Sequence, residues 1–117
     1  MLSFIIKKLE VFELSSFANA QKITEIAFSQ NIQCFCPLGN DWYTNQLEVT
    51  FTPSDIIPDY CDVDDFTRSL GGKALIIEDV VNAVYEYIVS NYNPVNLCVV
   101  SKVNDAKHMP VIVTKKM

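Results

Sequence analysis

A cysteine and an aspartate flank a short turn-like segment, and their chemistry raises the first question about this chain. Cys36 precedes Pro37 at the end of a predicted strand, and Asp41 follows five residues after the cysteine. A thiolate at this place could attack an electrophilic carbon, with the carboxyl group donating or accepting the proton. The structural alternatives are a small buried cysteine and an aspartate that bonds to its own turn backbone. The residue types alone leave both interpretations open.

Two further side chains could bind a ligand or transfer protons. Glu78 stands at the start of a predicted helix, where a carboxylate normally complements the positive end of the helix dipole. A carboxylate that accepts two parallel N–H donors is also a common way to hold a guanine-like ring. His108, the only histidine, could act as a general acid or base, or stand in solvent without a role.

The acidic and cysteine-containing segments do not have the spacing of metal sites. The run Asp62–Asp65 is typical of a capped helix start, since it has neither the ligand spacing nor the closing glutamate of a calcium loop. Cys34 and Cys36 lack a second pair of cysteine or histidine ligands for zinc. We therefore predict no metal site, and free thiols at all four cysteines.

The composition indicates a single globular domain over residues 1–117. Half of the residues are hydrophobic and the formal net charge is −5. This acidic balance, without a large cluster of lysines or arginines, argues against binding to nucleic acid. No run of about 18 apolar residues is present, and the order of apolar and basic residues at the N-terminus does not fit a signal peptide. We therefore predict a cytoplasmic protein that does not bind membranes.

Hydrophobic patterning predicts the elements that would position these side chains. Alternation and β-branched content predict four strands, the first of them long enough to carry a bulge, at residues 22–36, 46–52, 96–103 and 110–114. Capping aspartates and a continuous apolar stripe predict two helices, at residues 62–70 and 76–92. Residues 1–20 form an N-terminal extension, in which residues 1–14 fit either a short strand or a helical turn.

The predicted order of elements is β-β-α-α-β-β. Two strands, two helices and two strands with short connections favour the α+β class, with both helices on one face of an antiparallel sheet. The two edges of such a sheet would be open. We therefore expect a homo-oligomer in which neighbouring subunits close the sheets into a barrel-like ring.

The order of these motifs resembles the tunnelling-fold, or T-fold, superfamily, and within it the 7-cyano-7-deazaguanine (preQ0) nitrile reductase family. That family carries C-P-x-T-G-Q-P-D-[WF]-A-T, then C-V-E-x-K-S-L-K, then F-H-E-D at the start of a helix. The corresponding segments here, within a resemblance that spans residues 22–114, are Cys36–Thr44, Cys61–Asp65 and Ile76–Asp79. Three features differ from the family motifs. The Cys-Pro loop of this chain is two residues shorter, acidic and aromatic residues stand in place of the Lys-Ser of the second motif, and Ile77 stands in place of the histidine of F-H-E-D.

The resemblance implies a role for three residues and a set of partners. Cys36 would be the nucleophile that forms a thioimide with a nitrile, Asp41 would transfer the proton, and Glu78 would anchor the 7-deazaguanine ring. NADPH would be the cofactor of an oxidoreductase, and the ligand would be a purine-like or pterin-like ring bound in a homo-oligomer. On this interpretation the chain is a divergent T-fold enzyme of queuosine biosynthesis.

Two alternatives stay open beside the reductase. The chain is also similar to the pterin-pathway synthases of the T-fold superfamily, through Leu47–Phe51 and Val63–Phe66. The histidines that bind zinc in those enzymes are absent, with Asn40 and Trp42 in the region instead, so zinc-dependent chemistry is not expected. The second alternative is a non-catalytic T-fold scaffold or ligand-binding protein.

Overall fold

The computed structural model describes residues 16–117, which contain six strands and two helices. The ambiguous segment 1–14 therefore lies outside the described residues. In chain order the elements are β1 (Ser16–Ala18), β2 (Ile26–Cys36), β3 (Asp41–Thr52), β4 (Ile56–Pro58), α1 (Tyr60–Ser69), α2 (Ile77–Tyr92), β5 (Asn96–Val103) and β6 (Val111–Lys116). The predicted order β-β-α-α-β-β is present, with two short strands, β1 and β4, that the sequence pattern did not indicate.

The main sheet has four antiparallel strands in the order β2-β3-β5-β6, and β1 pairs with β4 in a separate small sheet. The pairing of β2 with β3 is continuous from Ile26 opposite Phe51 to Cys36 opposite Asp41. The hairpin therefore has no bulge over these residues, although the predicted first strand was long enough to carry one. Strand β2 starts four residues later than predicted: Lys22 has a positive φ of 58°, which is not an extended conformation, and pairing with β3 begins only at Ile26.

The second strand of the hairpin, β3, is longer than the strand that the apolar alternation predicted. β3 begins at Asp41 instead of residue 46, because the turn after Cys36 is tight and pairing starts at once. Asn40 has a φ of 54° in this turn, a left-handed conformation that asparagine tolerates better than most residues. The Asn40 amide donates to the Cys36 carbonyl at 2.8 Å and closes the turn.

Both helices form near the predicted places, with different starts. α1 begins at Tyr60 because the Asp59 carboxylate caps it, accepting a hydrogen bond from the Cys61 amide at 2.8 Å. α2 follows its predicted apolar stripe, and Val84 and Ile88 on that stripe are fully buried. Asn93, with a φ of 45°, ends α2 in a left-handed cap.

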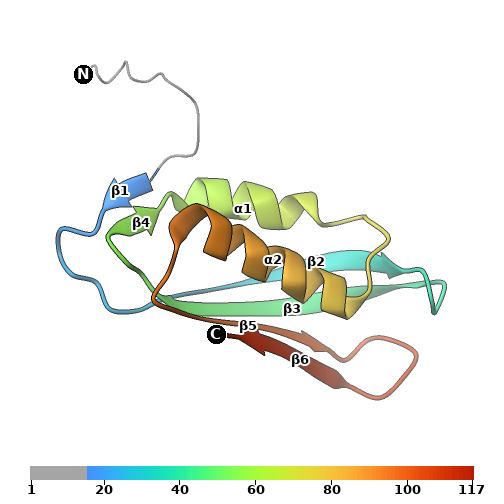
Figure 1. Ribbon diagram of the computed structural model, residues 1–117. Coiled ribbons are helices and arrows are strands. Elements are labelled where there is room, and N and C mark those ends of the chain that lie inside the picture. The colour runs from blue at the N-terminus through green and yellow to red at the C-terminus, as the bar shows by residue number, and fades with distance from the viewer. Residues whose placement is uncertain (1–15) are drawn as a thin grey trace.

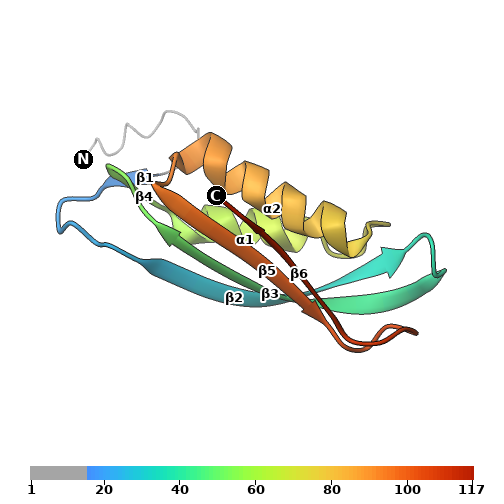
Figure 2. The ribbon, with the colours of Figure 1, turned by 60° about the horizontal axis from the view of Figure 1, so that its bottom comes forward.

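Both helices lie on the same face of the main sheet, as the two views agree (Figures 1 and 2). Alternate residues of β3 and β5, including Val49 and Val99, point into the layer between sheet and helices and are fully buried. The fold class is therefore α+β, as predicted. No helix in the described part of the chain is both long and apolar enough to cross a membrane.

Candidate functional site

A pocket of about 450 Å³ lies at the turn end of the β2–β3 hairpin. Three parts of the chain line it: the hairpin turn, the start of α2, and the loop between β5 and β6. Cys36, Asp41 and Glu78 all belong to its wall. The structure thus brings together the three residues that the resemblance singled out, although Glu78 follows Asp41 by 37 positions in the sequence.

Cys36 and Asp41 are direct cross-strand neighbours. They form the last pair of the β2–β3 register, so their Cα atoms are about 4.5–5.5 Å apart and their side chains lie on one face. Since residues two apart in a strand share a face, Cys36 lies on the helix side with the buried Cys34. The Cys36 thiol is half-buried, and the Gly39 amide donates a hydrogen bond to its Sγ at 3.3 Å.

Both oxygens of the Asp41 carboxylate have partners. Oδ1 accepts a hydrogen bond from the Trp42 amide at 2.8 Å, which is the local turn bonding expected of an aspartate at this place. Oδ2 lies 3.6 Å from Nζ of Lys107. Asp41 therefore makes the local backbone contact and also lies beside Cys36, so the two interpretations of this residue are compatible.

Glu78 is exposed and is the second residue of α2. Its place in the first turn complements the helix dipole, and its side chain also lines the pocket. N-capping is not its role, because the N-cap is Ile76 and makes no side-chain hydrogen bond there. A carboxylate at the pocket wall is available to accept N–H donors from a ligand.

The start of α2 reaches the pocket because the preceding segment pairs with the edge of β2. The Phe35 amide donates to the Lys73 carbonyl at 2.9 Å, and the Leu75 amide donates to the Phe35 carbonyl at 3.1 Å. The Tyr43 hydroxyl donates to the Leu75 carbonyl. Burial raises the pKa of Tyr43 to about 12. These contacts fix the position of Glu78 relative to Cys36.

The loop between β5 and β6 supplies two cationic or titratable side chains, Lys107 and His108. His108 is a candidate general acid or base by residue type, and the structure places it at the pocket. Its Nδ1 lies 2.7 Å from the Met109 carbonyl, which can only accept, so Nδ1 carries a proton. Nothing in the sequence marked Lys107, because a single lysine in a polar loop has no distinguishing pattern.

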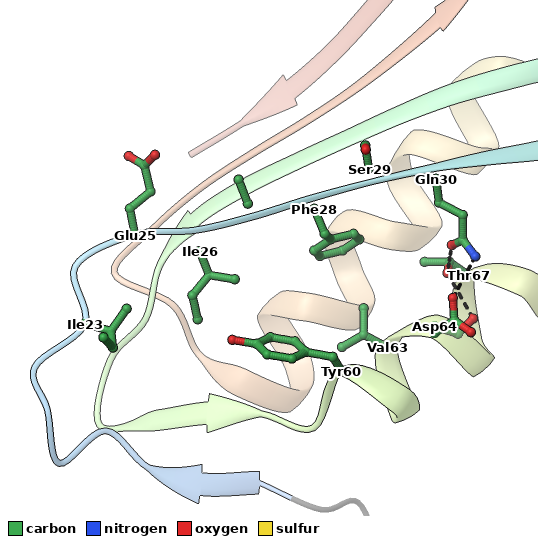
Figure 3. A pocket seen from close by; sticks show the side chains of 11 residues that line it. Ile23, Glu25, Ile26, Phe28, Ser29, Gln30, Tyr60, Val63, Asp64 and Thr67 are labelled. Atoms are coloured by element: carbon green, nitrogen blue, oxygen red, sulfur yellow. Dashed lines mark hydrogen bonds between the residues drawn. The ribbon is translucent and has the colours of Figure 1, made fainter.

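The acidic segment of α1 lies at the other end of β2 from Cys36. Asp64 lines a second pocket, of about 640 Å³, with residues near the start of β2 such as Ile26 (Figure 3). Gln30 donates to Asp64 Oδ1 at 2.8 Å and accepts from the Thr67 hydroxyl, as the dashed lines show (Figure 3). This polar cluster is satisfied internally.

These surroundings do not fit the phosphates of NADPH. The segment that takes the place of the family's Lys-Ser stretch presents carboxylates, and the one arginine nearby, Arg68, pairs with Asp64 at 2.8 Å. Carboxylates repel a dinucleotide phosphate, so this surface lacks the positive charge that such a group needs. Within residues 16–117 no group of three or more metal-ligating side chains is present either.

Comparison with known proteins identifies similar structures but no similar sequence. No family model matches the sequence, and no curated protein matches it. The fold is similar to a crystal structure described as the archaeosine synthase QueF-Like in the apo form, with a TM-score of 0.72. The chain has a T-fold. The two sequences are 14 % identical over 80 % of this chain and 93 % of the other, so the likeness supports the fold alone.

Proposed function

We propose that this protein binds a purine-like ring of the 7-deazaguanine type at the Cys36 pocket, and that Cys36 adds to the nitrile of 7-cyano-7-deazaguanine. The observation that carries the proposal is the convergence of Cys36, Asp41 and Glu78 on one pocket. The T-fold and its similarity to a structure described as an archaeosine synthase are consistent with a 7-deazaguanine ligand.

The pocket has suitable size and walls for a flat ring. Its volume of about 450 Å³ is in the usual range of ligand sites, about 300–1,000 Å³. Leu38 and Trp42 are large exposed apolar side chains in its wall, and they would cover the faces of a heterocycle. The Glu78 carboxylate would accept two N–H donors from the ring edge, as a guanine-like amidine group presents them.

The chemical step follows from the pairing of Cys36 with Asp41. The Asp41 carboxylate takes the thiol proton, and Sγ forms a bond to the nitrile carbon while one C–N π bond breaks. The electron pair moves to the nitrile nitrogen, which receives the proton back from Asp41. The product is a neutral thioimide, and no external oxidant or reductant is consumed in this step.

The proposed reaction of this chain stops at the thioimide. Reduction of the thioimide by NADPH would complete a nitrile reductase, and NADPH when bound would supply the hydride. The carboxylates on α1, including Asp64, do not fit its phosphates. The second candidate function is a T-fold protein that binds the ring without chemistry, which the isoleucine at position 77 favours because the resemblance expects a histidine there.

The test is intact-mass spectrometry after incubation with 7-cyano-7-deazaguanine. The wild type should gain the mass of one ligand, Cys36→Ala should gain none, and Cys61→Ala, which removes an exposed thiol on α1, should behave as the wild type. Glu78→Gln should weaken noncovalent binding, because an amide accepts one N–H where the carboxylate accepts two. Binding without an adduct would support the non-catalytic candidate. If the wild type shows neither an adduct nor noncovalent binding, both candidate functions are excluded.

A further inference from the structure

The loop between β5 and β6, residues 104–110, is attached to the β2–β3 hairpin by the side chain of Asp105. Asp105 Oδ1 accepts a hydrogen bond from the Thr44 amide at 2.9 Å. Thr44 lies in the part of β3 before its pairing with β5 begins at Gln46. The Asp105 contact therefore extends the attachment of the loop beyond the end of the β3–β5 ladder, toward the pocket.

The attached loop places the Lys107 side chain beside the Asp41 carboxylate. The Lys107 side chain is 74 % exposed and the Asp41 side chain is 50 % exposed, and Nζ lies 3.6 Å from Oδ2. The Trp42 amide already holds Oδ1. The carboxylate is thus held at both oxygens, by a backbone donor from its own strand and by an ammonium group from a distant loop.

We propose that Lys107 is a positioning residue of the Cys36 site, acting through Asp41. This inference rests on the proposed function, in which Asp41 exchanges a proton with the Cys36 thiol. Without the ammonium group only the Trp42 amide restrains the carboxylate, which can then rotate about its side-chain bonds away from the thiol.

Another lysine of the same sheet provides a matched control. Lys102 pairs with Glu48 at 3.2 Å, and these side chains are 44 % and 51 % exposed, so the acidic partners match and the control lysine is the less exposed of the two. Neither Lys102 nor Glu48 lines the Cys36 pocket. Lys102→Met therefore removes an exposed ion pair of the same kind without touching the proposed site.

The experiment measures the modification rate of Cys36 by peptide mass mapping, with two electrophiles, 7-cyano-7-deazaguanine and iodoacetamide. The exposed Cys61 in the same sample serves as the reference thiol for iodoacetamide. Lys107→Met should slow modification of Cys36 by about two- to fivefold, as expected for an exposed ion pair, and Lys107→Arg should restore the rate. Lys102→Met should leave it unchanged.

A double-mutant cycle with Asp41→Asn tests whether Lys107 acts through the aspartate. The effect of Lys107→Met should disappear in the Asp41→Asn background, because the carboxylate that it holds is then absent. Raising the salt from about 0.1 M to about 1 M should slow the wild type and leave Lys107→Met unaffected, since the Debye length falls from about 10 Å to about 3 Å. A purely structural role would not give this salt response.

The outcomes separate this inference from the proposed function. An equal effect of Lys107→Met with and without Asp41, or no effect with either electrophile, would overturn the positioning role. If the nitrile gives no adduct with the wild type while iodoacetamide shows the full pattern, the proposed substrate is wrong and the positioning role of Lys107 stands.

Discussion

The hydroxyl group of Tyr43 allows the most direct test of how the site is held. Tyr43 is 3 % exposed, and its hydroxyl donates to the Leu75 carbonyl in the segment that leads into α2. Tyr43→Phe removes this donor while keeping the aromatic ring and its packing. The Leu75 carbonyl, which belongs to a half-buried residue, then loses its hydrogen-bond partner.

The expected cost follows from the hydrogen bond alone. A typical intramolecular hydrogen bond contributes about 0.5–1.5 kcal/mol, and leaving a buried acceptor unpaired costs about 1–3 kcal/mol. Because Leu75 is only half-buried, water can reach part of its surroundings, and we expect a loss of about 1–2 kcal/mol in the free energy of unfolding. Urea denaturation followed by circular dichroism would measure it.

Tyr92 provides the matched control for the same substitution. It is 1 % exposed, and its hydroxyl has no hydrogen-bond partner of acceptable geometry, although the Tyr87 hydroxyl lies nearby. Tyr92→Phe removes an unpaired buried polar group, so its free energy of unfolding should stay within about 0.5 kcal/mol of the wild type or rise. Equal losses for Tyr43→Phe and Tyr92→Phe would refute the argument, because the ring would then account for the effect and the hydrogen bond would not.

Three further predictions concern the elements around the site. Asp59→Ala removes the side chain that caps α1 and should cost about 0.5–2 kcal/mol of stability in urea denaturation, whereas Asp59→Asn should retain most of it. Ile88→Ala opens a cavity at a fully buried position of α2 and should cost about 2–5 kcal/mol, whereas Val95→Ala, at an exposed position, should cost little. The hydrogen bond from the Thr44 amide lowers the pKa of Asp105 below its ordinary value of 3.8. The contact therefore stabilises the folded protein fully above pH 3.8, and this stabilisation is lost as the pH falls through the lower pKa of the folded state.

Each of these has a clear contrary result. A stability for Asp59→Ala equal to that of the wild type would mean that the α1 cap contributes nothing to folding. A loss below about 1 kcal/mol for Ile88→Ala would mean that the layer between α2 and the sheet collapses around the smaller side chain. For Asp105, acid titration of unfolding should show a smaller loss in Asp105→Ala than in the wild type; parallel curves would contradict the contact with Thr44.

Local chemistry explains which parts of the site could be predicted from the sequence. Cys36 and Asp41 are close in the chain, and the turn segment between two strand-like runs is enough to predict that they lie near each other. Glu78 stands out in the sequence because its helix has a continuous apolar stripe and a clear start. Its proximity to Cys36 was implied only by the resemblance, since no rule of local sequence places a helix start beside a hairpin turn.

Tertiary contacts explain what was missed. The strands β1 and β4 have three residues each, too few to show a period, and they form because they pair with each other. The first part of β3 is a strand because β2 pairs with it, although its own sequence, Asp41–Asn45, does not alternate clearly. Lys107 approaches Asp41 from a loop that Asp105 attaches to Thr44, far from both residues in the sequence.

The sequence by itself determined the α+β class, the two helices, the hairpin and the residues with reactive side chains, because hydrophobic period, capping and turn chemistry act over a few neighbouring residues. Only the tertiary structure decided that Cys36, Asp41, Glu78 and Lys107 share one pocket. That arrangement depends on the parallel pairing of the segment before α2 with the edge of β2, and on the attachment of the β5–β6 loop. Both are contacts between residues more than 30 positions apart, and no local pattern encodes such contacts.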